Sequence, residues 1–121
     1  MSENIVSEKS MKLAVRVVRL YQYLSEEKKE CILSKQMLRS GTSIGANIKE
    51  ALQGQSKKDF TAKMSISLKE ANETEYWLEL LYETNKLSKE QFESIYNDCT
   101  EVSKLLTSIV KTSRGNKAED I

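Results

Sequence analysis

The residues of this 121-residue sequence that are best suited to bind a ligand are lysines and arginines gathered in one stretch. Between Lys28 and Lys63 there are eight basic and three acidic residues, a net charge of +5. Such a stretch attracts phosphate groups, because binding releases the counterions that surround a nucleic acid. The candidate nucleic-acid-binding residues are Lys35, Arg39, Lys49, Lys57, Lys58 and Lys63. An ordinary solvated face remains the alternative, since the net charge of the whole chain is only +1.

Carboxylates follow in the next part of the chain, with five Glu and no Lys or Arg between Glu70 and Glu83. Helical spacing places Glu70 at the edge of an apolar stripe, where an ionised carboxylate needs a partner. We expect Glu70 to be substantially buried and paired with Arg39 or Asn47. Three others at i, i+4 and i+8 are expected to face solvent: Glu75, Glu79 and Glu83.

The absence of histidine excludes several kinds of site. Two-metal carboxylate sites in helical bundles use Glu-x-x-His pairs, and Ser-His or Cys-His catalysis needs an imidazole. Cys31 and Cys99 lack metal-binding spacing, so we expect two buried thiols in a reducing compartment. The sequence therefore predicts a non-enzymatic protein with no cofactor and no metal.

A row of small and amide side chains lies beside the apolar stripe of the second predicted helix. We call this row the polar seam; its members are Gln36, Ser40, Ser43, Asn47 and Glu50. Side chains of this size let another helix approach closely and form hydrogen bonds with it. The other helix could belong to the same bundle or to a second subunit, and the polar seam is therefore a candidate oligomer interface.

The elements that position these residues are predicted to be long helices, because the chain has no Pro and only four Gly. Apolar residues recur at helical spacing from about residue 7 to residue 24, where five are expected to form the core stripe: Ala14, Val17, Val18, Tyr21 and Leu24. Ser25 is a candidate N-cap for a second helix that ends near Leu52. Gly41 and Gly45 inside it indicate a kink or a close helix approach.

Two further helices have recognisable starting signals. Ser56 followed by Asp59 resembles a capping box, and Ser88 followed by Gln91 is one of the S-x-x-Q form. These signals predict a third helix that closes at residues 85–87 and a fourth that runs to about residue 112. The sequence therefore predicts an all-α, antiparallel, up-down-up-down four-helix bundle over residues 1–112, with a mobile tail over 113–121.

The longest apolar runs are only a few residues, whereas a membrane-spanning helix needs about 20. The first ten residues, MSENIVSEKS, include acidic side chains and no apolar signal region. We therefore expect a cytoplasmic protein with no membrane partner.

Three stretches together resemble the 23S rRNA intervening-sequence protein family, a group of bacterial four-helix bundle proteins. They are MLRSGTSIGAN at 37–47, QSKKDF at 55–60 and LKEANETEYWL at 68–78. The resemblance covers about residues 5–112 and departs at Asn72, where members often have Arg. It implies a ring-shaped homopentamer and provides no catalytic residues. A related group, the accessory proteins of diversity-generating retroelements, works with a reverse transcriptase and nucleic acid.

Two classes of function remain open from the sequence. The first is an oligomer that binds structured RNA or DNA through the basic residues of the second helix and the start of the third. The second is a purely structural or protein-interaction oligomer whose basic residues keep it in solution. The predicted partners are further copies of the chain, RNA or DNA, and a reverse transcriptase if the gene is associated with a retroelement.

Overall fold

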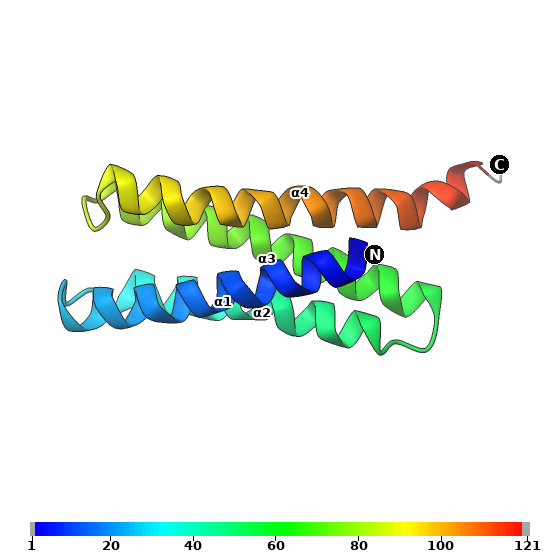
Figure 1. Cartoon of the computed structure of the whole chain (residues 1–121), viewed down its shortest axis with the longest axis horizontal. Coiled ribbons are helices and arrows are strands. Elements are labelled where there is room, and N and C mark those ends of the chain that lie inside the picture. Colours follow the sequence, from blue (N-terminus) through cyan, green and yellow to red (C-terminus); the bar gives the residue numbers. More distant parts are fainter. Residues whose placement is uncertain (1, 120–121) are drawn as a thin grey trace.

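The computed structural model describes the backbone of residues 2–119 and the side chains of residues 3–115. Within it the chain folds into four long helices. They are α1 (Ser2–Glu26), α2 (Ile32–Leu52), α3 (Lys57–Glu83) and α4 (Lys89–Glu119). Consecutive helices run in opposite directions (Figure 1). The predicted all-α, up-down-up-down four-helix bundle is confirmed.

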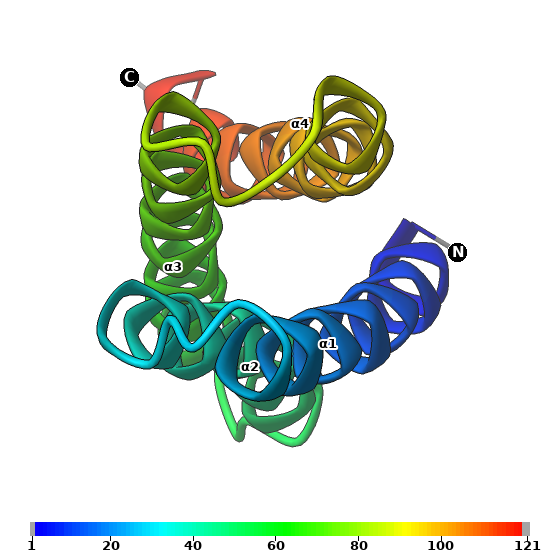
Figure 2. The ribbon, with the colours of Figure 1, turned by 90° about the vertical axis from the view of Figure 1, so that its left-hand side faces the viewer.

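Each helix packs against its sequence neighbours, and α4 also contacts α1. The contact between α2 and α3 is the most extensive, and the contact between α1 and α4 is the smallest. Figure 2 shows the helices end-on, with α1 and α4 further apart than the other neighbouring helices. None of the helices within the described residues is long and apolar enough to cross a membrane.

The core lies between the four helices and is made of aliphatic side chains. The largest fully buried ones include Leu13, Val17, Leu24, Met37, Ile44, Ile48, Met64, Leu78, Leu81, Val102 and Leu106. Each contributes roughly 1.5–3 kcal/mol through removal from water. The predicted placement of Val18 in this core is wrong, since its side chain is 37% exposed. Leu13 and Val6 are buried on α1 instead, because the core stripe of this helix is rotated from the predicted one.

The predicted N-caps are confirmed for α3 and α4 and wrong for α2. Ser56 accepts a hydrogen bond from the Asp59 N–H, and Ser88 and Gln91 form a reciprocal capping box. Ser25, however, lies inside α1, and its hydroxyl donates to a carbonyl of its own helix. The Glu30 carboxylate accepts from two N–H groups at the start of α2, at 2.9 and 3.0 Å. One carboxylate thus satisfies two unpaired donors of the helix end.

Two further helix ends differ from the predicted ones. α1 begins at Ser2, five residues before its predicted start, and Glu3 stands in its first turn, where the helix dipole favours a negative charge. α4 continues beyond its predicted end at residue 112 to Glu119, because a single Gly115 is a small obstacle in a chain without Pro. Residues 120 and 121 of the predicted tail lie outside the described residues, and its mobility stays a prediction.

The two glycines of α2 allow a close approach to α1, one of the two predicted alternatives. A Cβ atom at Gly41 would lie 2.8 Å from Cγ1 of Val17, and one at Gly45 would lie 3.2 Å from the Ser10 hydroxyl. The first distance is shorter than real Cβ contacts, so Gly41 is required where α1 and α2 touch.

Candidate nucleic-acid interface

The six candidate basic residues lie in several different places on the bundle. Lys35 and Lys49 are both exposed on α2, but fourteen positions separate them, or about 21 Å along the helix axis. Lys57 and Lys58 are exposed at the start of α3. No ion pair connects these four lysines to a carboxylate among the described residues. The two other candidates, Arg39 and Lys63, are paired within the chain.

Arg39 belongs to a network between α2 and α3 that involves two glutamates and a tryptophan. Its Nη1 lies 3.4 Å from both carboxylate oxygens of Glu70, and its Nη2 donates to Oε2 of Glu73. The indole Nε1 of Trp77 donates to the same Glu73 oxygen at 3.1 Å. This hydrogen bond from Trp77, together with Arg39, lowers the pKa of Glu73. The charge of Arg39 is therefore balanced inside the chain.

The expected partner of Glu70 is confirmed by this network. Its side chain is only 19% exposed and pairs with Arg39, one of the two predicted candidates. The other candidate, Asn47, donates instead to the carbonyl of Ser43 in its own helix. Lys63 forms a separate ion pair with Glu50 of α2, at 2.7 Å between Nζ and Oε1.

The polar seam lies beside the contact between α2 and α3. Ser40 is fully buried and accepts a hydrogen bond from the Thr74 hydroxyl at 2.8 Å. Ser40 therefore contributes to a helix contact within the same chain, which is one of the two alternatives that the sequence left open. Ser43 and Asn47 are half-buried and bond to backbone carbonyls of α2, whereas Gln36 and Glu50 are exposed. The rest of the seam stays a candidate interface between subunits.

A groove with three basic residues lies between the start of α3 and the last turns of α4. We call it the cationic groove; it has a volume of about 360 Å³ and is lined by Lys57, Lys58, Thr61, Ala62, Ser113 and Arg114. The Arg114 guanidinium donates to the Ser65 hydroxyl at 2.9 Å, and the hydroxyls of Thr61 and Ser113 bond to each other. None of the described residues that line this groove carries a carboxylate. Arg114 was not among the predicted candidates.

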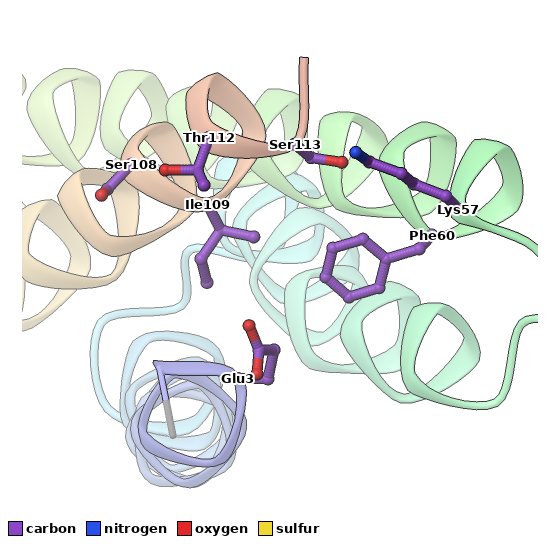
Figure 3. A pocket seen from close by; sticks show the side chains of 7 residues that line it. All are labelled: Glu3, Lys57, Phe60, Ser108, Ile109, Thr112 and Ser113. Carbon is purple, nitrogen blue, oxygen red and sulfur yellow. The ribbon is translucent and has the colours of Figure 1, made fainter. Parts of the chain in front are cut away.

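A second hollow adjoins this groove. We call it the Phe60 hollow; it has a volume of about 290 Å³ and is lined by Glu3, Lys57, Phe60, Ser108, Ile109, Thr112 and Ser113. Lys57 and Ser113 therefore line both spaces. Figure 3 shows the side chains of Phe60 and Ile109 directed into the hollow, while Lys57 extends toward Ser113.

An apolar surface on α1 was also missed by the sequence interpretation. Met11, Val15 and Val18 are 65%, 40% and 37% exposed. We call these three residues the α1 apolar face. A groove of about 540 Å³ lies between α1 and α2, and Met11, Lys49 and Leu52 are among the residues that line it. The spacing of the three residues at i, i+4 and i+7 marks a second apolar stripe that could have been found in the sequence.

The expectation of two buried thiols is wrong for Cys31. Cys31 is exposed, and only Cys99 is buried, where burial raises the pKa of its thiol to about 12. Glu79 and Glu83 are exposed as expected, whereas Glu75 is half-buried. Glu75 and Glu79 also accept hydrogen bonds from Ser103 and Tyr96 of α4, each at 2.6 Å. The acidic stretch of α3 therefore binds the neighbouring helix. No group of three or more Cys, Asp or Glu side chains within the described residues is placed to hold a metal ion.

Comparison with known proteins agrees with the fold. The family described as "23S rRNA-intervening sequence protein" matches residues 2–108. The chain is also similar to a crystal structure of a protein of unknown function, from the S23 ribosomal protein family of Bacteroides thetaiotaomicron VPI-5482, with a TM-score of 0.90. The two sequences are 61% identical, and the similarity covers 92% of this chain and 99% of that one. No curated protein matches the chain.

Proposed function

Because the chain belongs to the 23S rRNA-intervening sequence protein family, we propose that it is a non-enzymatic, oligomeric bundle that binds RNA or DNA through its cationic groove. The observation on which this proposal depends is the pairing pattern of the basic residues. Lys57, Lys58 and Arg114 line one groove to which the described part of the chain contributes no carboxylate. Arg39 and Lys63, by contrast, have their charge balanced by glutamates of the same chain.

The position of the groove at a helix N-terminus adds to its attraction for phosphate. The first N–H groups of α3 have no partner within the helix, and the helix dipole is positive at this end. Ser56 satisfies one of these donors, that of Asp59. In a ring of several copies the groove would be repeated, so a long polyanion could bind at several points with increased avidity. The number of five copies rests on the family resemblance.

A salt titration combined with a charge reversal tests this function. The affinity for a labelled RNA hairpin would be measured by fluorescence anisotropy at 50 and 200 mM salt. If three basic residues each contact one phosphate, the affinity should fall roughly 40-fold between these two salt concentrations. The double substitution Lys57→Glu with Lys58→Glu should abolish binding at the higher salt, because it replaces two attractive charges with two repulsive ones.

The matched control is Lys28→Glu with Lys29→Glu, which makes the same charge change on two exposed lysines between α1 and α2. The connection between α1 and α2 that contains them lies at the end of the bundle opposite the start of α3 (Figure 1). We expect this control to keep most of the affinity. Equal losses in both variants would contradict a specific groove. If the wild-type protein binds no nucleic acid at 50 mM salt, the nucleic-acid function is excluded and only the protein-interaction function remains.

A protein-interaction role is the second candidate, supported by the α1 apolar face. Apolar side chains grouped on a surface commonly mark contacts between proteins. The substitution Val15→Glu would place a charge in this face, and we expect it to lower the native mass measured by light scattering. Thr107→Glu on the exposed side of α4 is the control and should leave the mass unchanged. An unchanged mass for Val15→Glu would exclude this face as the contact between subunits.

A further inference from the structure

We propose that the Phe60 hollow receives one unpaired base of a single-stranded segment whose phosphates follow the cationic groove. This inference rests on the proposed nucleic-acid function and specifies its ligand. The Phe60 hollow and the cationic groove share a wall, because Lys57 and Ser113 line both of them. A ligand that occupied both would need an anionic part on one side and a flat, mainly apolar part on the other.

The lining of the hollow fits a base better than a phosphate. Phe60 and Ile109 offer apolar surface, and Ser108 and Thr112 offer hydroxyl groups at its border. Glu3 of α1 also lines the hollow. A nucleobase has apolar faces and polar edges, and it stacks readily on an aromatic ring.

The two spaces also separate charge in the order that a nucleotide needs. Lys58 and Arg114 line only the cationic groove, whereas Glu3 and Phe60 line only the hollow. Figure 3 shows the Phe60 ring facing the space between α3, α4 and the start of α1. A phosphate beside Lys57 would therefore leave its base next to Phe60.

Base pairing would prevent this arrangement. A paired base in a regular duplex is stacked between its neighbours, and its faces are closed to a protein side chain. Only a base in a loop, a bulge or a single strand can turn out of the stack and enter a hollow of about 290 Å³. The structure thus favours single-stranded segments over regular duplexes as the ligand of this site.

The experiment compares three ligands of 12 nucleotide units each: a 12-nucleotide single strand, a duplex of six base pairs, and a 12-unit strand without bases. We expect wild-type protein to bind the single strand about tenfold more tightly than the strand without bases, because one base stacks on Phe60. Phe60→Leu keeps an apolar side chain against the core but removes the ring. It should abolish this tenfold difference and leave the affinity for the strand without bases unchanged.

A second measurement does not depend on the folding of a variant. A strand with a single 2-aminopurine should gain fluorescence on binding to wild-type protein, because the base leaves the stack of its neighbours, which quenches it. The inference is overturned if wild-type protein binds the two strands equally, if the duplex binds as tightly as the single strand, if Phe60→Leu keeps the tenfold difference, or if the fluorescence is unchanged.

The same data distinguish this failure from a failure of the proposed function. If Lys57→Glu with Lys58→Glu weakens binding of every ligand while Phe60→Leu changes nothing, the cationic groove is confirmed as the phosphate site and the proposed base site is wrong. If no ligand binds to wild-type protein at 50 mM salt, both proposals are wrong.

Discussion

Arg39 and Lys58 both belong to the basic stretch of the sequence, yet they lie in different surroundings. Arg39 sits where α2 packs against α3, and two glutamates balance its charge. Lys58 lies in a groove with two other cations, and no carboxylate among residues 3–115 lines it. The difference teaches that a net charge counted along the sequence is not the charge that a ligand meets. The first region holds the bundle together, and the second is available for binding.

The largest expected difference between the two regions concerns their glycines. Gly41→Ala should lower the free energy of unfolding by about 2 kcal/mol, because the new Cβ would overlap the β-branched Val17. Gly115→Ala, beside the cationic groove, meets no heavy atom within 4 Å and should stabilise the protein by up to about 1 kcal/mol. Urea unfolding of both variants checks this pair. Equal effects would contradict the contrast in packing.

A smaller effect is expected when the charge of Arg39 is removed. Arg39→Gln should lower the free energy of unfolding by about 1–2 kcal/mol, because the nearly buried Glu70 loses its cationic partner. Lys58→Gln should change the stability by less than about 0.5 kcal/mol, since Lys58 is exposed and forms no ion pair with the described residues. Denaturation in urea at pH 7 measures both. A stability loss in Lys58→Gln as large as that in Arg39→Gln would contradict the distinction.

The smallest expected effect is a change in pH dependence at Trp77. The hydrogen bond from Trp77 is the largest cause of the lowered pKa of Glu73. A carboxylate with a lowered pKa contributes stability at pH values above its unfolded pKa and loses it as the pH falls through the folded pKa. Trp77→Phe should raise the pKa of Glu73, so wild-type protein should lose more stability than the variant between pH 6 and pH 3. Unfolding followed by circular dichroism at several pH values measures this difference, and identical slopes would contradict it.

Much of the fold could be predicted because its signals are local. The capping residues Ser56 and Ser88 lie three positions from their partners, and the core stripes of α2, α3 and α4 follow the helical period. The pairing of Glu70 with Arg39 was also predictable, because a carboxylate at the edge of a core needs a cation nearby.

Other features could not be predicted because they depend on which residues compete or meet in space. Ser25 has the residue type of an N-cap, but the carboxylate of Glu30 offers two acceptors and fixes the start of α2 further along. The first helix has two apolar stripes, so Val18 could be assigned to the core as easily as Leu13. The cationic groove joins Lys58 to Arg114, residues 56 positions apart, and only the packing of α3 on α4 brings them together.

The central claim is that the cationic groove binds nucleic acid and that Arg39 does not. The most direct test measures the RNA affinity of Lys58→Gln and Arg39→Gln over a range of salt concentrations, with unfolding measured on the same samples. We predict that Lys58→Gln lowers the affinity and reduces the slope of the salt dependence by about 1, while Arg39→Gln leaves both unchanged. An Arg39→Gln variant that loses as much affinity and slope as Lys58→Gln would contradict the claim.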